Sequence, residues 1–435
     1  MDSPAPSLPW RHPLEAFASL RDTPYSLLLL GDGDEGRWSH ILAHPRTASL
    51  HGQAEAALGW AQAHVDALEA ATSPPGAPPL RTGVAGLLGY DPGCARGGPP
   101  SAVALYDLVL AFDHQTRTVC LQEAPGACPR RRAALLSGLA APSPPPGGAT
   151  GQVADVEPRA NFGAKVEAVR ARIAEGEFYQ ANISRQFEGR LGALDHPFDL
   201  FRRLAKASPA AFAAYLRLPG CAIVSNSPER LVRVRNTPEG RIALSSPIKG
   251  TAPRGASPEV DALNARDLLA SEKDRAENLM IVDLMRNDLS RACRPGSVRT
   301  PRLFELTTLP NVHHLVSHVE GMLEPDRTAI DLLEACFPAG SITGAPKRRA
   351  MEAIREIEGS PRGADYGSLF WAGADGELDS SVLIRTATCR ETPDGWSVGF
   401  RVGCGITSDS DPEAETRETE AKALKLIAAI GGEGP

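Results

Sequence analysis

Apolar and polar positions follow their clearest pattern in the last two thirds of the chain, where they predict helices alternating with strands. Apolar residues recur at helical spacing from 162 to 173, and Gly176 ends that helix. In the strand that follows, 178–187, side chains alternate in direction, and one face carries only polar residues, Gln180, Asn182 and Ser184. Such a face either meets solvent or lines a site, and the pattern leaves both open.

The next apolar stretches predict a hairpin that ends at a lysine. A strand from 221 is broken by Ser-Pro-Glu, the hairpin turns at about 236–240, and the return strand leads into Lys249. Pro247 fixes its own φ and Gly250 allows a turn directly after the lysine, so the amine is presented at a strand end. We expect Glu229 and Lys249 to lie on partner strands and to face a common cleft. A lysine beside a glycine is ordinarily a solvated surface residue, so its neighbours must decide its role.

Helix-period patterns predict helices at 259–269 and 272–290, the second capped by Ser271. Glu277 lies in the apolar row of the second helix, either at the edge of a solvated face or as a buried ligand. Near the C-terminus, SDPE at 410–413 predicts a capping box with Ser410 opening a helix that runs to 430. That helix places Glu418 and Lys422 four residues apart, a spacing that is ordinarily a surface salt bridge.

Two glycine-bearing turns have backbone amides suited to anions. GSITGAPK at 340–347 precedes a helix whose apolar positions, Ala350, Met351, Ile354 and Ile357, face inward. The second turn, GCGI at 403–406, follows a strand and leads into the last helix, where its amides can receive a carboxylate. Either turn alone is more often a plain connection.

A Pro/Gly-rich linker at 141–155 divides the chain into residues 1–140, with short apolar strands, and residues 156–430. The net charge of -7 argues against a nucleic-acid partner. No apolar run reaches membrane-spanning length, and the N-terminus lacks a signal-peptide core. The eight cysteines are scattered without paired spacing, so we expect reduced thiols and a cytoplasmic location.

Nine stretches, in this order, resemble the chorismate-utilising enzymes of the anthranilate synthase component I family, and within it the large subunits of aminodeoxychorismate synthases. They are GYD at 89–91, YQAN at 179–182, SPER at 227–230, PIKGT at 247–251, DRAENLMIVDLMRND at 274–288, HLVS at 314–317, GSITGAPK at 340–347, DSSVLIRT at 379–386 and the segment 403–422. The resemblance implies an α+β fold: two large, mostly antiparallel sheets packed as a sandwich, helices outside, and the active site in a cleft between lobes. Residues 1–140 would be the N-terminal part of that fold and 156–430 the chorismate-binding catalytic domain.

The resemblance also implies roles for single residues. Glu277 and Glu418 match the family's Mg²⁺ ligands, and carboxylates with water suit that hard ion. Glu229 matches the acid that protonates the departing hydroxyl of chorismate. The residues that match its substrate pocket are Gln180, His314, Thr343, Arg385, Gly403, Cys404, Gly405 and Lys422; Arg385 is expected to grip the enolpyruvyl carboxylate.

Lys249 distinguishes the activities within the family. Aminodeoxychorismate synthases carry lysine here, as a nucleophile towards ring carbon 2, whereas anthranilate synthases carry alanine. Gln180 stands where isochorismate and salicylate synthases carry a lysine that activates water, which favours ammonia as the incoming group. We therefore expect synthesis of 4-amino-4-deoxychorismate for 4-aminobenzoate and folate. Anthranilate synthase is the alternative enzyme, and a non-catalytic chorismate-binding subunit is the alternative of another class.

Ammonia must reach such a site from elsewhere. No stretch resembles a glutaminase, since none of the cysteines sits in a Gly-x-Cys-x-Gly context. The resemblance therefore implies a separate glutamine amidotransferase subunit in a heterodimer, with an aminodeoxychorismate lyase acting downstream. The segment 28–33 lacks the serine-bearing motif with which many relatives bind tryptophan, so tryptophan binding is not expected.

Overall fold

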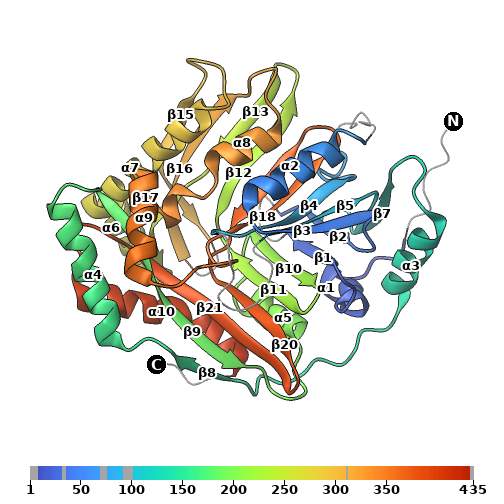
Figure 1. The fold of residues 1–435 in the computed structure, drawn as a ribbon, viewed down its shortest axis with the longest axis horizontal. Helices are drawn as coiled ribbons and strands as arrows, with labels where there is room; N and C mark the ends of the chain where they lie inside the picture. Colours follow the sequence, from blue (N-terminus) through green and yellow to red (C-terminus); the bar gives the residue numbers. More distant parts are fainter. Residues whose placement is uncertain (1–7, 32–35, 69–75, 92–100, 310–311, 432–435) are drawn as a thin grey trace.

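The fold was analysed in a computed structural model, which describes residues 8–31, 36–68, 76–91, 101–309 and 312–431. Two large sheets dominate it, and every strand pair in them is antiparallel (Figure 1). The eleven-stranded sheet follows the order β17 (Gly344–Ala345), β9 (Gln180–Arg190), β21 (Gly395–Ile406), β20 (Thr386–Thr392), β11 (Cys221–Ser227), β10 (Phe212–Leu218), β1 (Leu27–Leu30), β2 (Trp38–Leu42), β6 (Leu108–Asp113) and β7 (Thr118–Glu123), with β8 (Gln152–Asp155) beside β9.

The ten-stranded sheet follows the order β14 (Ile248–Pro253), β16 (Val312–Met322), β13 (Gly240–Ser245), β12 (Arg230–Thr237), β19 (Leu378–Val382), β18 (Ser368–Gly373), β4 (Gly83–Leu88), β5 (Ser101–Tyr106) and β3 (Thr47–His51), with β15 (Arg299–Thr308) beside β16. The helices are α1 (Pro13–Phe17), η1 (Ala18–Leu20), α2 (Ala54–Val65), α3 (Pro129–Ala140), α4 (Arg159–Ala174), α5 (Pro197–Ala207), α6 (Pro258–Ala270), α7 (Glu272–Ser290), α8 (Ala329–Cys336), η2 (Gly340–Ile342), α9 (Lys347–Glu358) and α10 (Pro412–Ile430).

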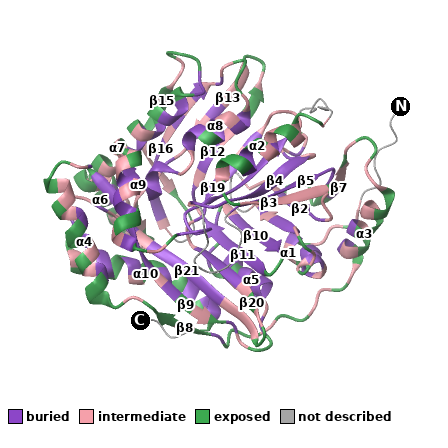
Figure 2. Cartoon of the chain, viewed as in Figure 1, coloured by how far each residue is buried: buried purple, intermediate pink, exposed green. Residues whose placement is uncertain are grey.

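The sheets pack face to face over an apolar core, which confirms the predicted sandwich. Leu27 and Ile223 from the eleven-stranded sheet meet Leu87 and Trp371 from the other. Helices α1, α5 and α10 cover the outer face of the eleven-stranded sheet, and α2, α7 and α8 that of the ten-stranded one. The central strands are buried while much of the helix surface is exposed (Figure 2).

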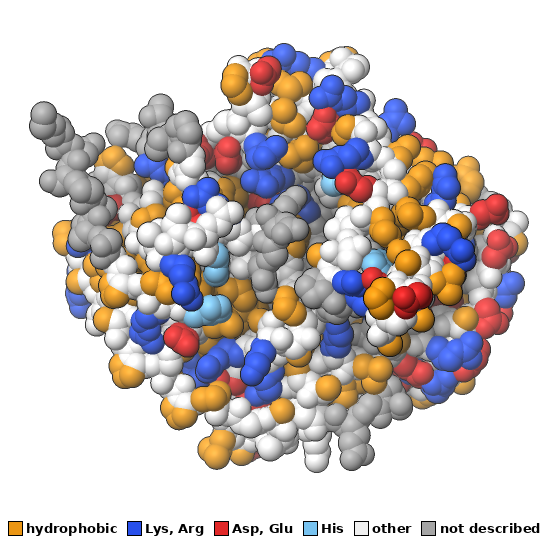
Figure 3. Space-filling view, turned by 180° about the vertical axis from the view of Figure 1, so that it is seen from behind, with side chains coloured by type: hydrophobic (Ala, Val, Ile, Leu, Met, Phe, Trp, Pro, Cys, Tyr) orange, Lys and Arg blue, Asp and Glu red, His pale blue; other side chains and the backbone are white. Residues whose placement is uncertain are grey.

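Residues 1–140 and 156–430 contribute strands to both sheets, so the chain between them connects two parts of one sandwich. The predicted linker 141–155 is without regular structure up to its last residues, where β8 pairs with β9. The prediction about residues 28–33 falls partly outside the described residues. Over the reverse face, acidic and basic side chains are interspersed (Figure 3).

Three local predictions were wrong in detail. The cap of α10 is Asp411, whose side chain accepts from the Ala414 amide, because Pro412 occupies the first helical position; Ser410 donates to Glu415 instead. The predicted turn 403–406 is the end of strand β21. The hairpin is formed by β12 and β13, and Lys249 lies one strand further, on β14; both β13 and β14 pair with β16.

Other local predictions were confirmed. Gly176 follows α4 with φ of 80°, and the Ser271 hydroxyl caps α7 by accepting from the Asp274 amide. The polar face of β9 is buried, with Gln180 only 1% exposed, so the solvent-facing alternative is excluded.

Candidate active site

Lys249 is half-buried and lies within electrostatic range of three acidic side chains. Its Nζ donates to the carbonyl of Ser341, in η2, over 3.4 Å. No carboxylate within the described ranges forms an ion pair with it, yet its ammonium lowers the pKa of Glu229, Glu277 and Glu418 alike. The amine and the three carboxyls are therefore close enough to act on one another electrostatically.

Glu229 sits in the turn between β11 and β12 and is 7% exposed. Burial raises the pKa of its carboxyl, opposed by the Ser341 hydroxyl and by the charges of Lys249, Arg385 and Lys422. A carboxyl whose pKa is raised by burial is suited to proton donation. The site thus places one acid close to one amine.

Glu277 and Glu418 project from α7 and α10, which are far apart in sequence. Burial raises the pKa of Glu277, and the nearby charge of Glu418 raises it further. For Glu418, burial acts in the same direction but is outweighed by Lys422, whose Nζ lies 2.6 Å from the carboxylate, so its pKa is lowered. The i,i+4 salt bridge exists, and it stands at the rim of the cleft with both side chains about half exposed.

Gln180 and Asn182 lie across the face of β21. Their carbonyl oxygens, Oε1 and Oδ1, are buried and accept no hydrogen bond within the described part of the chain. A Cβ on Gly405 would stand 2.1 Å from Gln180 Nε2, and one on Gly403 would stand 2.9 Å from Asn182 Oδ1. These glycines are therefore needed for a close approach between strands.

The amides of Gly403 and Gly405 point away from β9. Ser184 and Asn182, their partners in register, donate their own amides to Glu358 and to the Thr343 carbonyl on the opposite side of β9. The pairs Gly403–Ser184 and Gly405–Asn182 are therefore non-hydrogen-bonded pairs of the β9–β21 ladder. The two glycine amides face the opposite edge of β21, beyond the last residue that pairs with β20. The Lys422 ammonium donates to the Gly403 carbonyl there, over 3.0 Å. Cys404 alternates with them, so its amide belongs to the ladder.

Arg385 and His314 complete the polar lining. The Arg385 guanidinium is mostly buried and makes no hydrogen bond or ion pair with another described side chain; burial lowers its pKa, against the influence of Glu229. His314 Nδ1 lies 2.9 Å from the Thr251 hydroxyl, while its buried Nε2 has no partner among the described groups. Burial and Arg385 lower the pKa of His314 to about 4, so the ring is neutral at pH 7.

Thr343 is placed differently from the other predicted residues. Its hydroxyl donates to the Ala339 carbonyl over 2.9 Å and is fully buried. It therefore stabilises the 340–347 turn instead of facing the cleft.

Two residues were missed by sequence reasoning. Tyr366 is fully buried, and its hydroxyl lies 2.7 Å from where a Gly403 Cβ would stand. Arg362 stacks between Tyr90 and Tyr366 and donates to the carbonyls of Ile342 and Asn182 over 2.8 and 2.6 Å. A single arginine in a Gly/Pro-rich loop carries no periodic signal, so only the Tyr-bearing motifs hinted at this cluster.

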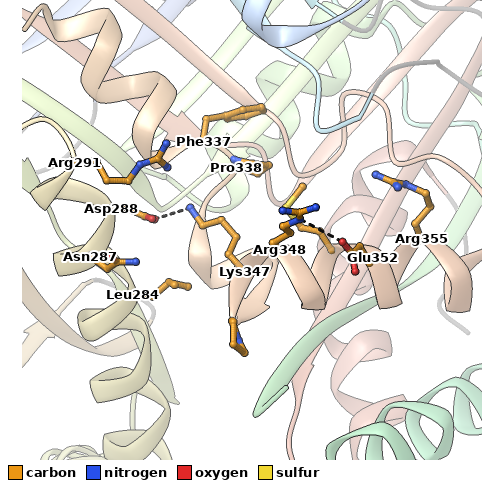
Figure 4. Close-up of a pocket in the computed structure, with 12 residues that line it drawn as sticks. Leu284, Asn287, Asp288, Arg291, Phe337, Pro338, Lys347, Arg348, Glu352 and Arg355 are labelled. Atoms are coloured by element: carbon orange, nitrogen blue, oxygen red, sulfur yellow. Dashed lines mark hydrogen bonds and ion pairs between the residues drawn. The ribbon is translucent and has the colours of Figure 1, made fainter. Parts of the chain in front are cut away.

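A large cavity lies beside this cleft and not in it. About 620 Å³ in volume, it opens between α7 and α9, on the other side of the 340–347 turn (Figure 4). Gln180 Oε1, Asn182 Oδ1 and His314 Nε2, which are buried and without a partner in the described part of the chain, lie on the cleft side, so the chemistry is assigned to the cleft.

The fold and the buried polar groups of the cleft agree with what the comparisons with known proteins show. The chain matches the family described as chorismate binding enzyme over residues 26–428, and it belongs to that family.

Within the family, the chain is 39% identical over 453 residues to aminodeoxychorismate synthase component 1 of Klebsiella aerogenes, with 97% of each chain covered. It is also 39% identical over 389 residues to anthranilate synthase component 1 of Streptomyces coelicolor, covering 82% of this chain and 74% of that one. Among solved structures, anthranilate synthase component I of Streptococcus pneumoniae superposes with a TM-score of 0.77 at 26% identity, covering 92% and 93% of the two chains.

Proposed function

We propose that this chain converts chorismate and ammonia to 4-amino-4-deoxychorismate, the precursor of 4-aminobenzoate. The observation that carries the proposal is the Lys249 amine, which approaches a single carbonyl and acts on the carboxyls of Glu229, Glu277 and Glu418. Support also comes from a relative of that name that matches along 97% of both chains.

The proposed reaction uses two groups of this chain in sequence. The Lys249 amine attacks ring carbon 2 while the double bond shifts and the hydroxyl at carbon 4 takes a proton from Glu229 and leaves as water. Ammonia then attacks carbon 4, the double bond shifts back, and the amine of Lys249 departs from carbon 2. Gln180 has no basic nitrogen, so it does not activate water in competition with ammonia.

The substrate's negative charges have matching partners. Arg385, which has no ion pair within the described ranges, and the outward amides of Gly403 and Gly405 are donors suited to a carboxylate. Glu277 and Glu418 fit a hard cation such as Mg²⁺, because the charge of Glu418 raises the pKa of Glu277, and a positive charge between the two carboxylates would relieve that repulsion. When bound, the ion supplies charge neutralisation for a substrate carboxylate. No cluster of three His, Cys, Asp or Glu occurs in the described ranges, so water and substrate would complete its ligands.

We further propose that ammonia comes from glutamine through a separate amidotransferase subunit. The name "component 1" of the relatives supports a second component. A cytoplasmic location is proposed because the described cysteines form no disulfide. No helix in the described part of the chain has the length and apolar character needed to span a membrane.

Anthranilate synthesis is the second candidate, favoured by the similarity to the Streptomyces coelicolor protein. The two candidate activities are distinguished by the product that each forms. The purified chain, given chorismate, Mg²⁺ and an ammonium salt, is expected to form 4-aminobenzoate only after an aminodeoxychorismate lyase is added. Fluorescent anthranilate appearing without the lyase would replace the leading proposal by the second.

A further inference from the structure

The cavity between α7 and α9 is a groove with an apolar floor and a charged rim. Leu284 of α7, Met351 of α9 and the Phe337-Pro338 segment form the floor. With a volume of about 620 Å³, it is large enough to receive several side chains (Figure 4). We call it the α7–α9 groove.

The rim of the α7–α9 groove is basic. Arg291, Lys347, Arg348 and Arg355 face two carboxylates, Asp288 and Glu352, which leaves two positive charges in excess on a chain whose net charge is -7. Lys347 is neutralised by Asp288, with 2.5 Å between Nζ and Oδ2.

Among the remaining cations of the rim, Arg291 donates to the Ala335 carbonyl, whereas Arg348 and Arg355 are exposed to solvent. The Arg348 side chain is 95% exposed and lies 3.5 Å from Glu352, and Arg355 has no ion pair in the described part of the chain. Exposed donors around an apolar floor suit a protein surface that presents carboxylates around an apolar side chain.

One turn separates this groove from the candidate active site. Lys347 lines the groove, whereas Ser341, six residues earlier, accepts from Lys249 on the cleft side. The same turn carries β17, which pairs with Gln180 of β9.

A second cavity of about 290 Å³ shares Phe337, Pro338, Met351 and Arg355 with the groove and reaches the exposed start of α2 at Gln53 and Glu55. Its lining includes Arg362, which bonds to Asn182 and Ile342 in the wall of the cleft. The second cavity and the wall of the cleft therefore share Arg362 as a common neighbour.

We propose that the α7–α9 groove is the docking surface for the ammonia-supplying subunit, a glutamine amidotransferase that presents acidic side chains around an apolar one. This inference rests on the proposed function. Docking here releases ammonia on the far side of the one turn that carries the acceptor of Lys249.

The test is a double charge reversal, Arg348→Glu with Arg355→Glu, in the full chain. Both side chains are on the surface, so the fold is retained. The matched control reverses two exposed arginines outside the groove, Arg266→Glu with Arg286→Glu, on α6 and α7. Binding to the purified cognate amidotransferase is measured by calorimetry, and turnover is measured with glutamine and, separately, with an ammonium salt.

In the groove variant, the dissociation constant is expected to rise about tenfold or more, and the glutamine-dependent rate at limiting partner is expected to fall by the same factor. The ammonium-dependent rate stays within about twofold of wild type, because no groove arginine touches the cleft. The control variant keeps both rates. Added salt weakens wild-type association more than that of the groove variant.

Unchanged binding by the groove variant would overturn the inference. So would loss of the ammonium-dependent rate at an unchanged melting temperature, since the arginines would then serve the cleft. If the wild-type chain forms a homodimer and the groove variant does not, the groove is the interface with a second copy of this chain instead. If the wild-type chain binds the amidotransferase through the groove but forms no aminodeoxychorismate from ammonium, the proposed function fails while the docking surface stands.

Discussion

The two sides of the 340–347 turn differ in how many hydrogen-bond partners their polar side chains have within the protein. On the groove side, Lys347 is fixed by Asp288 over 2.5 Å and by the Cys336 carbonyl over 3.1 Å. On the cleft side, Lys249 reaches one carbonyl at 3.4 Å, and Gln180 and His314 keep buried atoms without a partner in the described part of the chain.

This difference separates a structural lysine from a reactive one. A buried polar atom without a partner costs about 1–3 kcal/mol, so a fold that keeps several of them together gives up stability at that place. A ligand that supplies the missing hydrogen bonds recovers that free energy on binding. Lys347 already makes its bonds within the protein and has nothing to offer a ligand in the cleft.

The comparison is tested most strongly by removing the cleft lysine. Lys249→Ala is expected to lower the rate of aminodeoxychorismate formation by about 10³-fold or more, because the variant lacks the amine that is proposed to attack the ring. The melting temperature should stay near that of wild type, since the ammonium makes one weak hydrogen bond. The lyase-coupled assay with ammonium measures the rate. Full turnover in this variant would reduce Lys249 to a marker of specificity.

The second prediction concerns Glu229 as the proton donor on the cleft side. Glu229→Gln is expected to reduce kcat by about 10²–10³-fold, because the amide cannot donate a proton to the departing hydroxyl. Burial raises the pKa of Glu229, and the acid form is the active one, so the wild-type rate falls as pH rises through that folded-state pKa.

The pH profile of kcat with ammonia held constant as the free base measures this effect. In Glu229→Gln, the residual rate should lack that alkaline decline. A decline that persists in the variant would assign it to another group.

On the groove side, the expected effect is on stability. Lys347→Met leaves the buried Asp288 carboxylate without its cation and is expected to lower the free energy of unfolding by about 3 kcal/mol. Burial already raises the pKa of Asp288 against the effect of Lys347, and losing the lysine raises it further.

The folded state of this variant then binds a proton more readily than the unfolded chain, so the destabilisation shrinks as pH falls through the raised pKa. Urea unfolding at several pH values measures it. Lys347→Met with Asp288→Asn, which removes the charge, should recover part of the loss. A neutral-pH stability equal to wild type would show that the pair contributes nothing.

Periodicity predicted those parts of the molecule that depend on neighbours in sequence. The cap of α7 at Ser271 and the alternation of side chains along β9 follow from local rules, although the pattern left open whether the polar face of β9 is buried. The family motifs marked Glu229, Lys249 and Glu277. The cap of α10 was misplaced by one residue, although Pro412 at the first helical position indicates Asp411.

The features that could not be predicted from the sequence are contacts between strands and turns that are distant in the chain. Gly403 and Gly405 indicate a turn when judged locally, but they serve the crossing of Gln180 and Asn182 over β21. Arg362 likewise joins the 340–347 turn to β9 through bonds to residues 20 and 180 positions away.

The smallest expected effect concerns the fit of Gln180 on the cleft side. Gly405→Ala places a Cβ 2.1 Å from Gln180 Nε2, so the side-chain amide of Gln180 must move. The backbone itself accepts alanine, because Gly405 does not have a positive φ. We expect the Kd for chorismate to rise about fivefold, near 1 kcal/mol, with little change in melting temperature. Titration of chorismate in the absence of ammonia measures the Kd.

A double-mutant cycle isolates the contact. In a Gln180→Ala background the new methyl has no amide to displace, so Gly405→Ala should then cost nothing further. If the two losses add in full, the alanine acts on the strand itself, and the unsatisfied oxygen of Gln180 plays no part in holding the substrate. A coupling of about 1 kcal/mol would instead show that substrate affinity depends on the Gln180 amide, whose oxygen has no partner in the described part of the chain. Lys347, across the turn, is already paired with Asp288 and would show no such coupling to the substrate.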